Sequence, residues 1–410
     1  LFAAILAARR IGLPEAPVFP MLADDDLARF GALYAALSGL GALVFLRQEA
    51  PAKEGPALCA LAALGAAALA AATHGATLFL GVEIVSLSLV GLFAFPMTRA
   101  AVETAYKYLV LGGSASAALL LGVAHFYAGA GSLALADWGG AGALAGLGTA
   151  LLLAGLAFKL ALAPFHAWTP DAYEGAPPGA AALAAVASKG ALILALLRLG
   201  AEAAPAEPVW SLGLALLGAA SILLGNLLAL MQSSLGRMLG WSSVAHSGYL
   251  AAILASGAPL APQTALFYLA AYAPALLAAF CVAAAIGPAP RLETLRGFGR
   301  ARPLAGAAFA LAMLSLAGLP IASGFLAKML MFGALVQAER WDLLAVAAIG
   351  SALGLFYYAR FLFAAYAPAD APAPPLALPD RGLLAASAAL IALLGVWPAP
   401  FLSLAGTVAP

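Results

Sequence analysis

Apolar stretches of about 20 residues recur along the chain, separated by short connections with polar, proline or glycine residues. The pattern predicts spans near residues 26–46, 56–73, 76–95, 103–128, 142–171, 179–200, 208–231, 241–257, 263–286, 303–338, 343–366 and 382–403. An apolar segment at 1–8 precedes them and is too short to cross a bilayer. We therefore predict an all-α, polytopic membrane protein with about 12 complete transmembrane helices and an N-terminal remnant.

Two of these spans are too long to cross the bilayer as straight helices. Residues 303–338 would extend about 54 Å, against a hydrocarbon core of roughly 30 Å. Each long span contains residues that interrupt helices: Pro164 in 142–171, and "AGLPIASG" around Pro320 in 303–338. Paired discontinuous helices in corresponding halves are typical of inverted-repeat transporters, so we predict inverted five-helix repeats.

This repeat predicts four parts along the chain. Residues 1–55 would form N-terminal helices, which we predict to be truncated because the sequence begins at Leu1 rather than at a methionine. Residues 56–200 would form the first repeat and residues 201–366 the second, each with one broken helix. Residues 367–410 would form a proline-rich linker and a C-terminal helix.

Composition supports a membrane location and excludes several functional classes. Hydrophobic residues make up 65% of the chain and charged residues only 9%, with a mean hydropathy of +1.02. A soluble domain has about a quarter of its residues charged. The net charge is +1 and no acidic or basic run indicates nucleic-acid binding. Four arginines in the connection 291–302 predict that this side faces the cytoplasm.

Four charged residues fall inside predicted spans: Glu83, Lys159, Lys189 and Lys328. A lysine at the bilayer centre costs about 2.5–3.5 kcal/mol on insertion scales, so each needs an explanation. One explanation is structural, with ion pairs that lock neighbouring helices together, and Glu83 serving as the partner of Lys159. The other is a proton or ion path. Four such residues in separate helices, two of them beside helix breaks, favour the path.

Electrostatics explains how such residues could handle protons. Removal from water disfavours a charged lysine, whereas a nearby carboxylate favours it, so the approach of Glu83 would control the proton on Lys159. His246, flanked by serines in "WSSVAHSGYL", could relay protons near neutral pH, or could simply hydrogen-bond across helices. Lys107, His166 and Asp171 are possible accessory groups. Alternatively, Lys107 extends to the interface and His166 satisfies carbonyls at the break.

Several motifs resemble one family in order along the chain. "FKLALAPFHAWTPDAYEGAP" is similar to the signature of the antiporter-like subunits of respiratory complex I, and its "TPDAYEGAP" ending is most similar to the subunit N type. "LGVEIVSLSLVGL", "AYKYLVLGG", "GNLLALMQSSLGRMLGWSSVAHSGYL" and "LSLAGLPIASGFLAK" resemble that type as well. The resemblance extends from about Asp25 to the end of the chain.

The resemblance implies a proton-translocating membrane subunit of NADH:quinone oxidoreductase, in a bacterial inner membrane. It implies a proton path through Glu83, Lys159, Lys189, His246 and Lys328. This chain would carry no redox cofactor: NADH, FMN, the iron–sulfur clusters and quinone would bind to partner subunits. Its partners would be other membrane-arm subunits, indirectly the hydrophilic redox arm, and membrane lipids.

Two other functions share this pattern. A subunit of a multisubunit cation/proton antiporter, or of a membrane-bound hydrogenase, would have the same broken helices and lysines. Lysine at position 328 is typical of subunit N, where the related subunit M usually has glutamate, and this favours the complex I subunit. The family usually has about fourteen helices, so the resemblance implies that about one and a half are absent at the start.

Overall fold

The fold is a bundle of helices, seen in a computed structural model that describes residues 2–13, 19–49, 54–203, 207–287, 289–369 and 378–410. Within these residues the only extended pairings are isolated bridges, so the all-α prediction is confirmed. The helices are α1 (Phe2–Arg10), α2 (Asp26–Glu49), α3 (Glu54–Ala70), α4 (Gly75–Ala94), α5 (Arg99–Ala130), α6 (Ala145–Leu160), α7 (Trp168–Gly175), α8 (Pro178–Leu183), α9 (Lys189–Glu202), α10 (Val209–Leu230), α11 (Leu235–Ala255), α12 (Ala261–Ile286), α13 (Leu292–Leu295), α14 (Phe298–Ala301), α15 (Pro303–Ala317), α16 (Ser323–Gln337), α17 (Trp341–Tyr366), α18 (Leu378–Val396) and α19 (Ala399–Val408).

Eight helical segments among the described residues are long and apolar enough to cross a membrane. A ninth is obtained if the bent pair α18–α19 forms one span. Three further apolar helices, α3, α15 and α16, are shorter than 18 residues. Most of the proline-rich segment 367–381 lies outside the described residues. The structure is thus a polytopic membrane fold, with fewer full-length spans than the apolar runs alone suggest.

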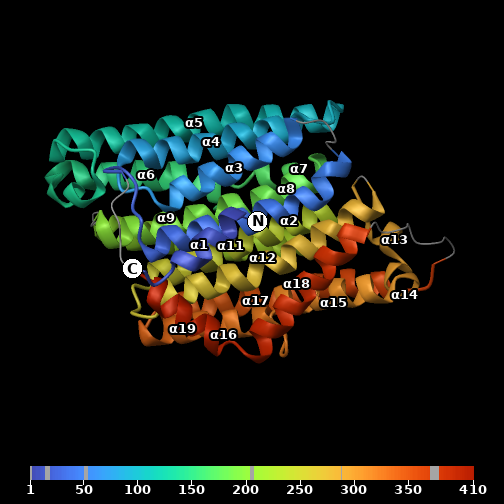
Figure 1. The fold of residues 1–410 in the computed structure, drawn as a ribbon. Helices are drawn as coiled ribbons and strands as arrows, with labels where there is room; N and C mark the ends of the chain where they lie inside the picture. Colours follow the sequence, from blue (N-terminus) through green and yellow to red (C-terminus); the bar gives the residue numbers. More distant parts are fainter. Residues whose placement is uncertain (1, 14–18, 50–53, 204–206, 288, 370–377) are drawn as a thin grey trace.

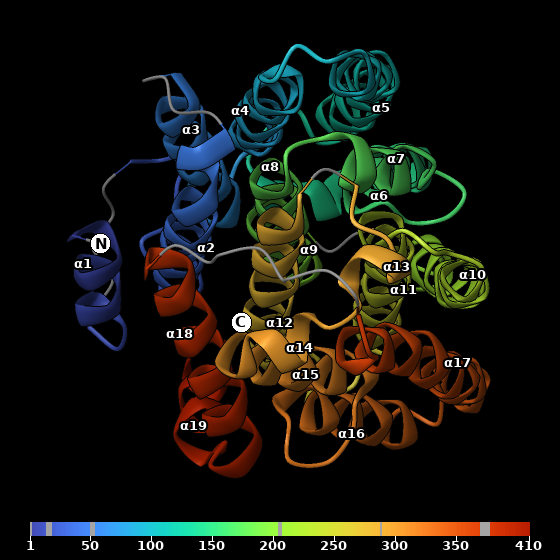
Figure 2. The same ribbon diagram turned by 90° about the vertical axis from the view of Figure 1, so that its right-hand side faces the viewer.

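The most buried span lies at the centre of the bundle. Within the Pro178–Glu202 segment, which contains α8 and α9, every residue of an 18-residue apolar window is buried, compared with 39% of such a window in α5 and 33% in α17. Viewed along the bundle in Figure 2, α3, α4 and α5 lie on one side and α16, α17 and α19 on the other, with α9, α11 and α12 between them. The helices that carry Lys189 and His246 are therefore shielded from lipid by neighbouring helices.

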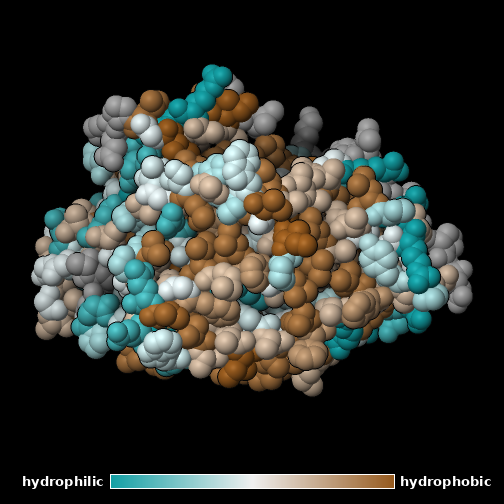
Figure 3. Space-filling view, turned by 90° about the horizontal axis from the view of Figure 1, so that it is seen from below, coloured by the Kyte–Doolittle hydropathy of each residue, from teal (hydrophilic) through white to brown (hydrophobic). Residues whose placement is uncertain are grey.

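Polar residues gather near the two ends of the bundle. In Figure 3, hydrophobic residues cover the middle of the visible face and hydrophilic residues lie mainly towards its two ends. The short helices α13 and α14, from the arginine-rich connection, lie at the right-hand end of Figure 1. A hydrophobic belt between polar ends is the surface that a bilayer selects.

Both predicted helix breaks occur. α6 ends at Leu160, the next residue, Ala161, has the left-handed φ of 61°, and α7 begins after a gap that contains Pro164. α15 ends at Ala317, the next residue, Gly318, has a φ of 80°, and α16 begins at Ser323. The last carbonyls of α6 and α15 therefore lie inside the bundle, where the negative end of each helix dipole attracts a cation.

The C-terminal span differs from the prediction. Residues 382–403 were predicted as one helix, but α18 and α19 meet at an angle of 87° at Trp397 and Pro398. Proline cannot continue the hydrogen-bond ladder of the preceding turn, so the chain changes direction there.

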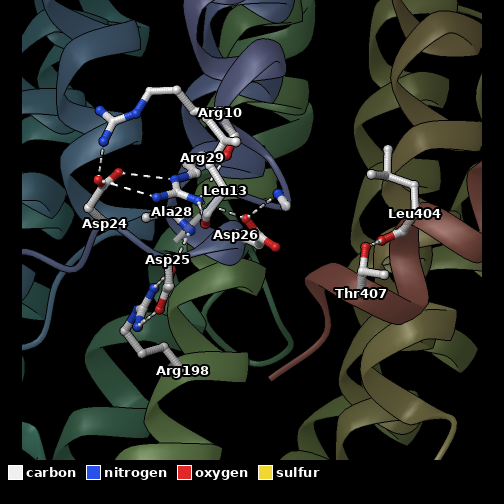
Figure 4. Close-up of polar contacts among 11 residues, drawn as sticks. Arg10, Leu13, Asp24, Asp25, Asp26, Ala28, Arg29, Arg198, Leu404 and Thr407 are labelled. Atoms are coloured by element: carbon white, nitrogen blue, oxygen red, sulfur yellow. Dashed lines mark hydrogen bonds and ion pairs between the residues drawn. The ribbon is translucent and has the colours of Figure 1, made fainter. Parts of the chain in front are cut away.

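Charged residues join the N-terminal helices to the centre of the bundle (Figure 4). Arg198, at the end of α9, donates to both carboxylate oxygens of Asp25 at 2.8 Å and to the carbonyl of Ala70 at 3.1 Å. Arg198 is 2% exposed. Arg29 of α2 contacts Asp24 and lies in the same charged cluster. These contacts hold α2 and α3 against α9.

Candidate functional site: a chain of buried lysines and hydroxyl groups

The first lysine lies beside a carboxylate. Nζ of Lys159 in α6 is 3.7 Å from Oε1 of Glu83 in α4 and donates to the Ser86 hydroxyl at 2.8 Å. Ser116 of α5 donates to the same Glu83 oxygen. Lys159 is 3% exposed and Glu83 24% exposed. The predicted ion pair between Lys159 and Glu83 is therefore present. Each of its two charged groups also hydrogen-bonds to a serine hydroxyl.

The position of Lys159 follows from the break. It lies in the last turn of α6, two residues before the left-handed Ala161. Its ammonium also lies near the rings of Tyr108 and Phe158, with centroid distances of 5.7 Å and 5.8 Å. A helix C-terminus and two aromatic faces both favour a cation, which makes a buried lysine tolerable here.

The second lysine contacts hydroxyl groups instead of a carboxylate. Nζ of Lys189 donates to the Ser243 hydroxyl at 2.6 Å and to the Ser247 hydroxyl at 3.2 Å, both on α11. A π-helical turn at Ala184–Ser188 immediately precedes it. Such single turns of π-helix often occur at functional sites. Among the described residues no carboxylate pairs with Lys189, so hydroxyl oxygens rather than an anion solvate its amine.

His246 lies between two tyrosines from other helices. Its Nδ1 is 2.7 Å from the hydroxyl of Tyr268 in α12, and its Nε2 is 3.1 Å from the hydroxyl of Tyr358 in α17. A neutral imidazole has one donor and one acceptor nitrogen, so one tyrosine donates to the ring and the other accepts from it. In the other tautomer of the ring both hydrogen bonds run in the opposite direction, so the imidazole can carry its proton on either side.

The third lysine caps the second broken helix. Nζ of Lys328 in α16 donates to the carbonyl of Ala317, the last residue of α15, at 2.9 Å. The face of the Tyr249 ring lies 5.6 Å away. A Cβ atom at Gly318 would come within 2.5 Å of the lysine side chain, so glycine is required both for its positive φ and for this approach.

Hydroxyl and aromatic groups connect three of these residues. The Tyr272 hydroxyl donates to Ser243, the partner of Lys189, at 3.0 Å, and its ring centre is 4.8 Å from that of His246. A small cavity, comparable in size to one water molecule, is lined by His246, Tyr272 and Lys328. A route from Lys189 to Lys328 is therefore nearly continuous. The described contacts do not join Lys159 to Lys189.

Two of the accessory residues, Lys107 and Asp171, form a separate cluster at α7. Asp171 accepts from Lys107 at 3.1 Å and from Arg237 at 2.8 Å, and Arg237 also reaches Glu174 at 3.3 Å. Lys107 is 43% exposed and also pairs with Glu103 at 2.8 Å. These residues hold α5, α7 and α11 together, next to the first break.

His166 does not contact Asp171 in the described structure. Its ring packs against Trp241, with 5.1 Å between ring centres, and its buried Nδ1 has no hydrogen-bond partner. Its role as an accessory group of the path stays a prediction.

Sequence reasoning missed most of the partners that hold the charged residues. Ser86, Ser116, Tyr268, Tyr272 and Tyr358 come from helices far from their partners in sequence. Only Ser86 carried a local signal, because it lies one helical turn after Glu83 and therefore on the same face.

Comparison with known proteins identifies the family. Residues 72–354 match the family described as NADH:quinone oxidoreductase/Mrp antiporter, transmembrane. NADH-quinone oxidoreductase subunit N of Rhodopseudomonas palustris is 57% identical over 364 residues, 89% of this chain and 80% of the relative. The chain belongs to the NADH-quinone oxidoreductase subunit N family. The same subunit of Cereibacter sphaeroides is 54% identical over 397 residues, 97% of this chain and 88% of the relative.

A solved structure agrees with this membership of the subunit N family. A chain of respiratory complex I from Thermus thermophilus, determined with bound aureothin, superposes with a TM-score of 0.90 at 38% identity. The match covers 98% of this chain and 91% of that one. The resemblance drawn from the sequence motifs is therefore confirmed.

Proposed function

We propose that this chain is the proton-translocating subunit N of an NADH:quinone oxidoreductase in a bacterial inner membrane. The observation that carries the proposal is the pair of helix breaks, each with a buried lysine at the C-terminal end of a half-helix. Lys159 donates to a serine hydroxyl, and Lys328 lines a small cavity together with His246. Membership of the subunit N family favours this over the alternative, a subunit of a multisubunit cation/proton antiporter or a membrane-bound hydrogenase.

The proton path has a proposed direction. Protons enter from the cytoplasmic side, the side of the arginine-rich connection, towards Lys189 and His246. Lys159 stores a proton under the control of Glu83, and release occurs near Lys328. Each proton moved against the membrane potential requires about 2.3 kcal/mol per 100 mV, which changes in the local charge around a buried lysine can supply.

The finer architecture and the assembly belong to the same proposal. The helices form about 12 spans, with inverted five-helix repeats at residues 56–200 and 201–366, preceded by 1–55 and followed by 367–410. Membrane-arm subunits and lipids surround the chain, and the redox arm acts on it indirectly. NADH, FMN, the iron–sulfur clusters and quinone bind to those partners, so the reaction performed here is proton transfer alone.

Substitution of Lys159 tests the proposal. Lys159→Met keeps most of the side-chain volume but removes the charge, and we expect proton pumping by the reconstituted complex to fall by about tenfold or more. The hydrophilic arm should still oxidise NADH with an artificial acceptor. Unchanged pumping per NADH oxidised would make Lys159 a structural residue. Proteins that co-purify with the chain separate the alternatives, because an antiporter would bring no flavin or iron–sulfur subunits.

A further inference from the structure

A buried amide lies next to the path but has no role in it so far. Asn226, the only asparagine in the chain, lies in the apolar helix α10 and is 1% exposed. A polar side chain buried inside a membrane span carries a desolvation cost and is a candidate functional residue.

The contacts of Asn226 fix its orientation. Its Nδ2 donates to the Ile222 carbonyl at 2.7 Å, and a carbonyl can only accept, so the nitrogen must face that side. The same nitrogen donates to the Tyr249 hydroxyl at 3.1 Å. The Tyr357 hydroxyl donates to Oδ1 at 3.0 Å. One side chain therefore holds two tyrosines, from α11 and α17, in defined directions.

These two tyrosines lead to the two titratable residues of the second half. The ring of Tyr249 lies beside the Lys328 ammonium. Tyr357 is followed by Tyr358, their ring centres are 4.3 Å apart, and the Tyr358 hydroxyl contacts His246. Tyr249 alone thus connects the Asn226 amide to Lys328, whereas Tyr357 and Tyr358 together connect it to His246.

We propose that Asn226 is a positioning residue for proton transfer between His246 and Lys328. It anchors the Tyr249 hydroxyl, so that the ring face stays against the lysine, and it anchors Tyr357, so that Tyr358 stays aligned with the histidine. The inference rests on the proposed proton path.

The packing of α17 against α10 is adapted to this amide. A Cβ atom at Gly350 would lie 2.4 Å from Ile222, 2.8 Å from the Tyr249 hydroxyl and 2.9 Å from Nδ2 of Asn226. Only glycine lets the α17 backbone approach closely enough for Tyr357, two turns later, to reach the amide.

A purely structural link between α10, α11 and α17 would use the same contacts, so the experiment must separate the two roles. The whole complex is reconstituted in proteoliposomes, and protons moved per NADH oxidised are measured for Asn226→Ala, Tyr249→Phe and the double variant. Tyr249→Phe keeps the aromatic ring and removes only the hydroxyl through which Asn226 anchors it. Leu214→Ala, a buried truncation on α10, is the matched packing control. Lys328→Ala is the reference for a blocked path.

We expect pumping to fall about fivefold in Tyr249→Phe, the factor that corresponds to one lost hydrogen bond, and at least as much in Asn226→Ala, which also releases Tyr357. The double variant should be no worse than Asn226→Ala, because that change already releases the Tyr249 hydroxyl. Leu214→Ala should pump at the wild-type rate. Asn226→Asp places a titratable group at the same position. At low pH its neutral carboxylic acid should support pumping. As the pH rises, its carboxylate should slow pumping, because the negative charge makes Lys328 retain its proton.

Two results would overturn the inference. If Asn226→Ala and Tyr249→Phe pump at the wild-type rate while Lys328→Ala does not pump, Asn226 is structural and the proton path stands. If the two losses multiply in the double variant, the amide does not act through Tyr249. Wild-type pumping by Lys328→Ala would instead refute the proposed path itself, and the positioning role with it. If the complex with Asn226→Ala fails to assemble, Tyr249→Phe and Asn226→Asp provide the test instead. Wild-type pumping by both of these variants at every pH would then overturn the positioning role.

Discussion

The substitution Glu83→Gln tests whether the carboxylate controls the proton on Lys159. Glutamine keeps the shape of the side chain and its oxygen can still accept from Ser116, which donates to Glu83 in the structure. The change therefore removes charge while leaving the packing between α4, α5 and α6 nearly intact.

The size of the effect follows from the 3.7 Å that separates the two charged atoms. Coulomb's law gives about 1 kcal/mol at the dielectric constant of water and about 4 kcal/mol at the effective value of about 20 that applies near protein groups. Lys159 is 3% exposed and Glu83 24% exposed, which places the pair towards the larger figure. That energy is comparable with moving one proton against about 170 mV. Glu83→Gln should thus remove most of the driving force of this step.

The assay compares pumping with the electron-transfer rate in proteoliposomes. Glu103→Gln is the matched control, because it makes the same change in a carboxylate that pairs with Lys107 but is 57% exposed. Solvent screens that pair, so its loss should leave pumping unchanged. Equal pumping by the Glu83 and Glu103 variants would refute the control of Lys159 by its carboxylate. Failure of the Glu83 variant to assemble would favour a purely structural ion pair.

Two further predictions concern contacts around the path. Arg198→Met leaves Asp25 without the cation that both its oxygens accept from, and should destabilise the chain by about 3 kcal/mol, seen as a lower unfolding temperature in detergent. Burial opposes ionisation of Asp25, but the hydrogen bonds from Arg198 and its positive charge lower the pKa of the carboxyl below 3.8. The stabilisation by this pair is therefore present above about pH 4 and is lost on further acidification. An identical acid-dependent loss of stability in the Arg198→Met variant would contradict the pairing. Ser221→Ala leaves the buried amide of Ala163 without its 2.8 Å acceptor at a cost of about 1–3 kcal/mol, and should speed hydrogen exchange there, whereas Ser221→Thr should not. Equal exchange in both variants would show that the hydroxyl does not hold the break.

The helix breaks and the first ion pair could be predicted because their signals are local. Proline and glycine inside an overlong apolar run identify a break, and a lysine next to that break requires a counter-charge, for which Glu83 was the available carboxylate. The bend at Pro398 carried a local signal too, but the apolar run continued across it and hid the change of direction.

The arrangement around His246 could not be predicted in the same way. Its partners Tyr268 and Tyr358 are 22 and 112 residues away, in helices whose neighbours are set by packing of almost featureless apolar surfaces. A tyrosine in a membrane helix is as compatible with the bilayer interface as with a buried hydrogen bond, so its type does not reveal its partner. The partners of Lys189, Ser243 and Ser247, are likewise distant in sequence, at 54 and 58 residues, and their residue type does not reveal the lysine.

The contact between Arg198 and Asp25 can form only well after α2 has been translated. The two residues are 173 positions apart, and α9 must be made before α2 can be held against it. At roughly 5–20 residues per second, the ribosome needs about 10–35 s to produce the intervening chain. During that interval the N-terminal helices have left the ribosome without their anchoring arginine, and the insertion machinery or a neighbouring subunit has time to act on them. α2 therefore reaches its final place only after α9 has been made.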